Sequence, residues 1–255
     1  MQINKVEDSI KNLIDVFFDA GKISLELRNK GLIEHIKKDN TPVTNGDIEV
    51  NKIILSSLKK ITPDIPVVSE ETSENKNLNL ETFWLVDPID GTYDYINNRD
   101  EFTLNAGLII NKEAVAGIIY APAKDRMFYS YGKNLSYELK NGKEEIINNK
   151  KIDKNNIKAV SYSNNLKPEI IQIHKKFNVK EYVKMKSSLK FCVIATGEYQ
   201  IYVAEPRAHE WDIAAGHAIL KNSSGVVTDF DGNNIIYGKE GFKNPSLILK
   251  SVETI

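Results

Sequence analysis

Apolar residues recur at helical spacing from the N-terminus onward, which is typical of a helix with one buried face. They predict a long amphipathic helix that begins at residue 3 and runs toward residue 27, with Gly31 near its end. Residues 37–46 are polar and rich in turn-forming side chains. We expect a second helix to begin at Asp47, because apolar residues recur at helical spacing again beyond it.

Shorter apolar runs follow, and their length and composition predict β-strands. The predicted strands cover residues 67–68, 83–86, 104–110, 114–120 and 127–131. Residues 136–139 and 145–147 are expected to pair as a hairpin, because the intervening Asn141-Gly142 suits a type I′ turn. The first part of the chain is therefore expected to combine a helical pair with an antiparallel sheet.

Residues 148–158 are rich in lysine and asparagine and carry few apolar side chains, so we expect an exposed connection there. This connection divides the chain into an N-terminal α+β half, residues 1–150, and a C-terminal α/β half, residues 151–255, which we expect to form one compact unit. Strand-like and helix-like segments alternate in the second half, which is typical of a layered fold. They are strands at 159–162 and 200–204, helices at 168–177 and 212–220, and an apolar segment at 189–196.

The composition excludes several classes of function. The formal net charge of −1 gives no electrostatic footprint for a nucleic-acid polymer, so none is expected as a partner. Cys192 is the single cysteine, which rules out an intrachain disulfide and suits a reducing compartment. No segment has the apolar length of a transmembrane helix, and the N-terminus lacks the layout of a signal peptide. We expect a cytoplasmic protein, and peripheral membrane association stays open.

The most informative stretch for chemistry is residues 84–92. Its apolar run ends in Asp87 and Asp90, with Pro88 between them and Gly91 directly after. Pro88 and Gly91 predict a tight turn that presents both carboxylates at its mouth. Taken alone, an Asp-Gly turn is ordinary, and the spacing does not match an EF-hand.

Further carboxylates in similar positions change that interpretation. Glu70 follows another apolar run, and Asp212 opens the predicted helix at 212–220. Oxygen ligands at several strand and helix ends suit Mg²⁺, and paired metal ions can clamp the attacking and leaving oxygens of a phosphate ester. Glu70, Asp87 and Asp90 supply such ligands, the Ile89 carbonyl is a plausible addition, and Asp212 could hold a second ion.

Other groups could serve the phosphate and the water. The helix N-termini after Gly91 and at Asp212 would offer backbone N–H groups to phosphate oxygens. The hydroxyl of Thr92 could orient a water molecule and pass a proton to Asp47.

In combination, these motifs resemble the Mg²⁺-dependent, lithium-sensitive phosphatase superfamily of inositol monophosphatase. The resemblance covers nearly the whole chain and rests on residues 87–92, on Glu70-Glu71 upstream, and on residues 41–47 and 211–216. It implies a layered αβαβα sandwich of the α/β (α+β) class, with the site between the halves. It also implies a small phosphorylated metabolite as partner, and it leaves monomer or homodimer open.

The resemblance further implies roles for single residues. Most metal ligands would lie in the N-terminal half, and the site would bind two or three Mg²⁺ ions. Thr92 with Asp47 would activate water, Glu70 would participate, and no phosphoenzyme is expected. The metal ligands would be Glu70, Asp87, the Ile89 carbonyl, Asp90 and Asp212, and the substrate would also contact Glu70, Ile89, Asp90, Gly91, Thr92 and Asp212.

Within the superfamily, residues 101–105, 187–192, 211–218 and 242–245 are similar to the 3′(2′),5′-bisphosphate nucleotidase (CysQ) branch. That likeness implies metal-activated hydrolysis of adenosine 3′,5′-bisphosphate to AMP and phosphate, a reaction tied to sulfur assimilation. Ser188 and Lys190 could then bind the second phosphate.

Some positions depart from the pattern of that branch. Tyr93-Asp94-Tyr95 stands where Lys-Glu-Phe is usual, and Ala204 stands where an arginine is usual, with Arg207 three residues later. An inositol monophosphatase or a broad sugar phosphatase therefore stays open, as does a non-catalytic protein that binds a nucleotide or a metal.

Overall fold

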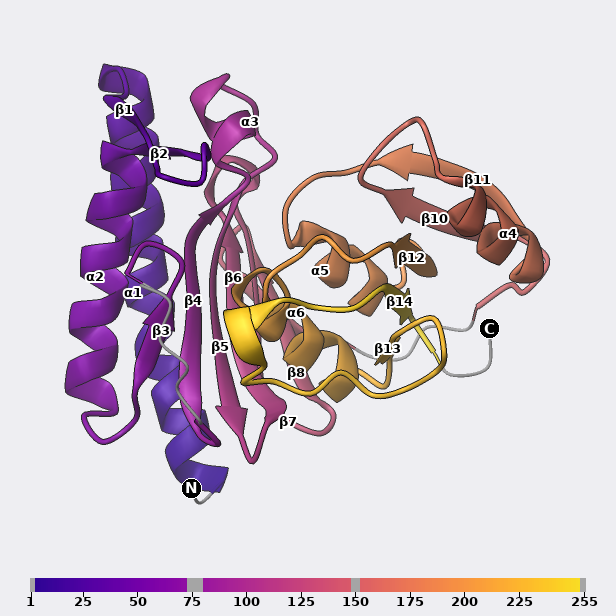
Figure 1. Ribbon diagram of the computed structural model, residues 1–255. Helices are drawn as coiled ribbons and strands as arrows, with labels where there is room; N and C mark the ends of the chain where they lie inside the picture. The colour runs from indigo at the N-terminus through magenta and orange to yellow at the C-terminus, as the bar shows by residue number, and fades with distance from the viewer. Residues whose placement is uncertain (1–2, 73–79, 148–151, 253–255) are drawn as a thin grey trace.

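The computed structural model describes residues 3–72, 80–147 and 152–252 (Figure 1). These residues stack as a helix pair, a seven-stranded sheet, a second helix pair, a five-stranded sheet and a final helix. The layered αβαβα sandwich expected from the resemblance is confirmed. No described helix has the length and apolar character needed to cross a membrane.

The first layer consists of α1 (Ile3–Lys30) and α2 (Asn45–Ile61), which bury their apolar stripes against the larger sheet. Gly31, with a φ of +98°, ends α1 as expected. Helix α2 begins two residues earlier than predicted, because Thr44 caps it and Asp47 completes a capping box. The stretch predicted to be only turns also contains a short antiparallel pair, β1 (Glu34–Ile36) and β2 (Pro42–Thr44).

The larger sheet has the strand order β3-β4-β5-β6-β7-β8-β9 and is antiparallel except for the β3–β4 pair. In β4, Trp84 and Val86 face α1 and α2, whereas Phe83 and Leu85 face the opposite layer. The predicted hairpin turn is present, with positive φ at both of its central residues. The strands are β3 (Val67–Ser69), β4 (Phe83–Asp90), β5 (Thr103–Ile110), β6 (Glu113–Ala121), β7 (Arg126–Gly132), β8 (Leu135–Lys140) and β9 (Lys143–Ile146).

The other face of this sheet contacts α5 (Leu189–Ala195) and α6 (Glu210–Asn222), and the smaller sheet lies beyond them. Its strand order is β11-β10-β12-β14-β13, and α4 (Pro168–Lys176) covers its outer face. These strands are β10 (Ile157–Ser161), β11 (Val179–Lys184), β12 (Ile201–Ala204), β13 (Val226–Thr228) and β14 (Leu247–Lys250). Three short helices complete the fold: α3 (Thr92–Ile96), η1 (Pro122–Lys124) and η2 (Glu240–Phe242).

Strands β11, β13 and β14 have no counterpart among the predicted elements. Strand β11 is an edge strand with mostly exposed side chains, and β13 and β14 are short, so none carries a long alternating pattern. Of the expected connection, residues 148–151 lie outside the described residues, and β10 begins at Ile157. The division of the chain into two halves at residue 150 stays a prediction.

Two glycines allow α6 to lie directly on the sheet. A Cβ on Gly107 of β5 would approach the backbone nitrogen of Ala215 to 2.6 Å, and one on Gly117 of β6 would lie 2.6 Å from the Cα of Ala215. Such contacts are shorter than real Cβ atoms tolerate, so a side chain at either position would displace α6 and the residues at its N-terminus.

We predict that Gly117→Ala lowers the free energy of unfolding by about 1–3 kcal/mol, because the added methyl group overpacks the interface with α6. Urea denaturation followed by circular dichroism measures the change. Gly132→Ala in β7 is the matched control, since a Cβ there meets only a side-chain carbon of Leu135 at 3.5 Å. Equal stability of the two variants would contradict the close packing of α6.

Candidate active site

The two aspartates of residues 84–92 lie in an irregular end of β4, and not in a tight turn as predicted. Strand β4 continues through Asp90, with Asp87 opposite Asn105 and Asp90 opposite Thr103 on β5. Two residues of β4 therefore bulge between these pairs, and one of them is Pro88, which has no N–H to donate to the ladder. The chain turns only at Gly91, where φ is +98°, and α3 follows directly.

A carboxylate cluster forms where β3, β4 and α6 meet. Glu70, Asp87 and Asp212 each offer a carboxylate oxygen, and these oxygens lie within 4.8 Å of one another. Glu70 is placed by its N–H, which donates to the Val86 carbonyl at 3.0 Å. Asp212 lies in the first turn of α6, where its side chain accepts from the His209 N–H at 2.8 Å.

Electrostatic repulsion within this cluster is strong. Burial, followed by the charges of Glu70, Asp90 and Asp212, holds the pKa of Asp87 well above its usual range. The pKa of Asp212 is also raised, first by burial and then by Asp90 and Glu70. Crowded oxygen donors that repel one another in this way fit a hard divalent cation, which would replace repulsion by attraction. The residues present therefore suit the metal that the sequence predicts.

Asp90 belongs to the same site through Ser188. The Ser188 hydroxyl lies 2.6 Å from the Asp90 carboxylate and 2.6 Å from the Asp212 carbonyl oxygen. It has a single hydrogen, so it donates to one of these acceptors at a time, and it accepts from the Asn105 side chain at 3.2 Å. Ser188 thus links the end of β4 to the start of α6. Asn105 was not identified from the sequence as a partner of this site.

Thr92 and Asp47 are also in contact, as the sequence suggests. The Thr92 hydroxyl lies 3.2 Å from one Asp47 oxygen and 3.1 Å from the Ile89 carbonyl. The other Asp47 oxygen accepts from the N–H and the hydroxyl of Thr44, at 2.8 and 2.6 Å. Burial raises the pKa of Asp47, although these hydrogen bonds oppose the shift. The Ile89 N–H donates to Asp87 at 3.1 Å, which fixes the backbone between the two aspartates.

Lys37 is a site residue that sequence reasoning missed. Its ammonium group lies 3.1 Å from Glu70 and 2.7 Å from Glu71. Although burial alone would lower it, the two carboxylates raise the pKa of Lys37 to about 12. Burial also raises the pKa of Glu71 to about 7. A lysine in a polar stretch carries no pattern of its own, and only the β1–β2 connection brings it to the site.

A cavity of about 220 Å³ adjoins Asp90 and Asp212. Lys190 and Arg207 both line it. Burial and then the nearby cations outweigh the carboxylates and lower the pKa of Lys190 to about 8. The remaining lining includes aromatic and small side chains, namely Tyr93, Tyr162, Phe191, Tyr202 and Ala204.

The site residues expected from the sequence therefore lie in one region, around the end of β4 that carries Asp87 and Asp90. Comparison with known proteins shows the family: the model of the inositol monophosphatase family matches residues 6–253. The chain belongs to the inositol monophosphatase family. It is thus a member of a phosphatase family, and its acidic cluster is one that could bind metal.

The chain is also similar to individual proteins of this family. The chain is 37% identical over 223 residues to 3′(2′),5′-bisphosphate nucleotidase CysQ of Buchnera aphidicola, covering 86% of this chain and 83% of that protein. It is 35% identical over 215 residues to CysQ of Salmonella typhimurium, covering 82% and 85%. The crystal structure of CysQ from Bacteroides thetaiotaomicron superposes with a TM-score of 0.80 at 28% identity, over 95% of this chain and 97% of that one.

We predict that Asp87→Asn stabilises the metal-free protein by about 1–3 kcal/mol, because it removes a buried charge that its neighbours repel. The folded-state pKa of Asp87 is raised, so the native state holds the extra proton, and wild-type stability falls as the pH rises above about 4. In the variant, the free energy of unfolding should fall less steeply with rising pH. Thermal unfolding in EDTA at several pH values measures the gain in stability and its pH dependence. A second series, with Mg²⁺ in place of EDTA, measures the response to the metal.

Asp64→Asn is the control, because Asp64 is exposed and lies outside the cluster. Added Mg²⁺ should raise the melting temperature of the wild type and of this control, and should raise that of Asp87→Asn much less. An equal Mg²⁺ response in all three proteins would contradict a metal site at Asp87.

Proposed function

We propose that this protein is a Mg²⁺-dependent phosphomonoesterase that hydrolyses adenosine 3′,5′-bisphosphate to AMP and inorganic phosphate. One observation carries the proposal: Asp212 of the carboxylate cluster lines a cavity that is also lined by Asp90 and by the cations Lys190 and Arg207. A substrate with two phosphates could place one at the cluster and the other at these cations. The names of the CysQ relatives support the same activity.

In this proposal the metal ligands are Glu70, Asp87, the Ile89 carbonyl, Asp90 and Asp212, which would hold two or three Mg²⁺ ions. The ions would neutralise phosphate charge and activate water for attack. The scissile phosphate would contact Glu70, Ile89, Asp90 and Asp212 through this centre, and Gly91 and Thr92 directly.

The chain supplies the remaining chemistry through Thr92, Asp47 and Glu70. The Thr92 hydroxyl donates a hydrogen bond to Asp47, so a lone pair of the Thr92 oxygen is free to orient the attacking water. Glu70 would accept a proton from that water. The water oxygen forms the new bond to phosphorus while the bond to the leaving ribose oxygen breaks, and the ribose oxygen takes up a proton. No covalent intermediate with the protein forms.

The second phosphate would be bound by Lys190 and Arg207. Arg207 stacks over Tyr162, with its guanidinium carbon 3.9 Å from the ring centroid, which fixes its direction. Ser188 lines the same cavity and is assigned here as a substrate contact and as the link between Asp90 and Asp212. The aromatic lining offers apolar surface to a nucleoside.

The wider setting is part of the proposal. We expect the enzyme in the cytoplasm, sensitive to lithium, and active in sulfur assimilation, where its substrate would be a small metabolite. It would act as a monomer or a homodimer.

The deciding experiment compares phosphate release from adenosine 3′,5′-bisphosphate and from inositol 1-phosphate, with Mg²⁺ and with added Li⁺. We expect kcat/KM to be at least about tenfold higher for the bisphosphate, which corresponds to about 1.4 kcal/mol of transition-state binding. A preference for inositol 1-phosphate would instead identify an inositol or sugar phosphatase. Release from neither would indicate a non-catalytic binding protein.

Lys190→Ala tests the phosphate contact within that assay. We expect kcat/KM for adenosine 3′,5′-bisphosphate to fall by about 10–100-fold, and kcat/KM for adenosine 3′-monophosphate to fall much less, because only the bisphosphate loses a charged contact. Lys60→Ala, at an exposed position in the last turn of α2, is the control. Equal losses on both substrates would remove Lys190 from the second-phosphate site.

Ser188→Ala tests the link between the two halves of the metal centre. Losing the hydroxyl between Asp90 and Asp212 should raise the Mg²⁺ concentration for half-maximal activity by about 10–100-fold, because outer hydrogen bonds orient metal ligands. Calorimetric titration of Mg²⁺ should show the same weakening without any substrate. An unchanged Mg²⁺ affinity by both measurements would show that Ser188 does not position the ligands. Ser56→Ala, on the exposed face of α2, is the control.

A further inference from the structure

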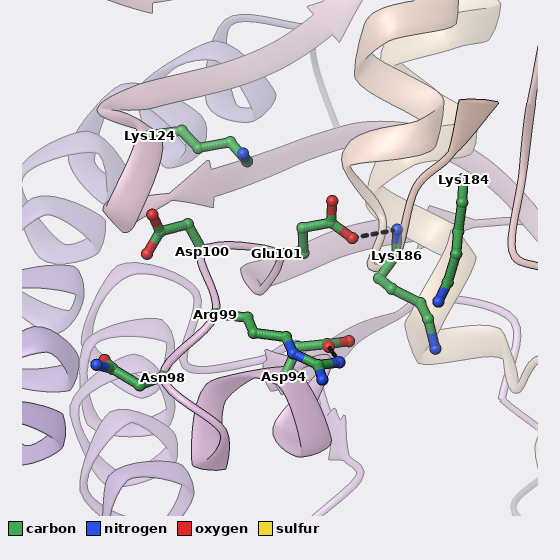
Figure 2. Close-up of a pocket in the computed structure, with 8 residues that line it drawn as sticks. All are labelled: Asp94, Asn98, Arg99, Asp100, Glu101, Lys124, Lys184 and Lys186. Carbon is green, nitrogen blue, oxygen red and sulfur yellow. Dashed lines mark hydrogen bonds and ion pairs between the residues drawn. The ribbon is translucent and has the colours of Figure 1, made fainter.

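A second cavity, of about 460 Å³, lies next to the one at the carboxylate cluster (Figure 2). Asp94 and Lys186 line both cavities, so the two spaces adjoin. The second cavity lies between residues 94–101 and η1 on one side and residues 184–186, which lead from β11 toward α5, on the other. No role in the proposed reaction accounts for this space.

Two of the three carboxylates in the lining are already neutralised by arginines. Arg99 pairs with Asp94 at 3.0 Å, and Arg28, which lies outside the lining, pairs with Asp100 at 3.3 Å. Arg28 also stacks over the Phe102 ring, which holds that pair against the protein. The acidic side of the cavity therefore contributes little free negative charge.

Three lysines remain, and within the described part of the chain none of them forms an ion pair. Lys124 comes from η1, and Figure 2 shows it on the opposite side of the cavity from Lys184 and Lys186. The remaining carboxylate is Glu101, whose oxygen accepts from the Lys186 backbone N–H at 3.1 Å. Three ammonium groups thus face a single carboxylate that no arginine neutralises. In a chain with a net charge of −1, this local excess of positive charge favours an anion.

We propose that this cavity is a further anion subsite, which binds the distal phosphates of a nucleoside 3′-phosphate that carries a phosphate chain at its 5′ position. The subsite rests on the proposed function, because the scissile phosphate must lie at the carboxylate cluster. The first 5′ phosphate meets Lys190 and Arg207, and the chain then continues past Lys186 to Lys124 and Lys184. The hydrolysed bond is unchanged: water attacks the 3′ phosphorus, and the 3′ oxygen leaves with a proton.

Lys186 lines both cavities and couples their charges. Its charge is among those that lower the pKa of Lys190, so the cations of the two cavities repel one another. A phosphate chain that runs between them would offset this repulsion along its whole length. A nucleoside bisphosphate ends at the first cavity and cannot do so.

The test compares hydrolysis of adenosine 3′-phosphate 5′-diphosphate, which yields ADP, with that of adenosine 3′,5′-bisphosphate. The double variant Lys124→Ala/Lys184→Ala should lower kcat/KM for the longer substrate by about tenfold, since two charged contacts are lost, and should change that for the bisphosphate less than about twofold. Lys133→Ala/Lys140→Ala is the matched control: both lysines are exposed, lie outside both cavities, and carry the same total charge.

Binding of the two nucleotides in EDTA, measured by calorimetry, separates this proposal from the proposed function. If neither nucleotide is hydrolysed, but the longer one binds more tightly and only the Lys124/Lys184 variant loses that advantage, the subsite stands and the assigned reaction fails. If the bisphosphate is hydrolysed, and Lys124→Ala/Lys184→Ala changes kcat/KM for the longer nucleotide no more than the control double variant does, the reaction stands and the subsite is overturned.

Discussion

The constraint on which the site depends is the crowding of buried carboxylates between the larger sheet and α6. Glu70, Asp87 and Asp212 bring oxygens within 4.8 Å of one another, although burial and mutual repulsion raise the pKa of both aspartates. The rest of the fold must supply the free energy that holds them together. That free energy comes from the apolar clusters on both faces of the larger sheet, which contain most of the buried side chains.

Close packing fixes where the elements that carry these carboxylates lie. Gly107 and Gly117 let the backbone of α6 lie on the sheet, so that Asp212 reaches the end of β4. Hydrogen bonds then set the side chains: Ser188 joins Asp90 to α6, and Thr44 holds Asp47 toward Thr92. The side chains of Asp90 and Asp47 are thus held in place by hydrogen bonds from neighbouring residues.

The two adjoining cavities indicate how one metal-centred reaction can be directed to particular substrates. In the proposed reaction the scissile phosphate would lie at the carboxylates, and further phosphates would lie at the cations that line the cavities. The departures at Tyr93 and Ala204 lie in the lining of the first cavity and not among the carboxylates. Variation within this family fold can therefore alter the substrate while the reacting centre is kept.

The sequence by itself determined the helical pair, most strands of the larger sheet and the acidic residues of the site, because periodicity and the Asp87–Thr92 motif are local signals. It did not determine the irregular end of β4, the edge strand β11 or the contacts of Lys37 and Asn105. Those features arise from pairings between residues far apart in the chain, for which no local pattern exists. Only the tertiary structure decided which charges would face each other across the two cavities, since that depends on how the layers pack.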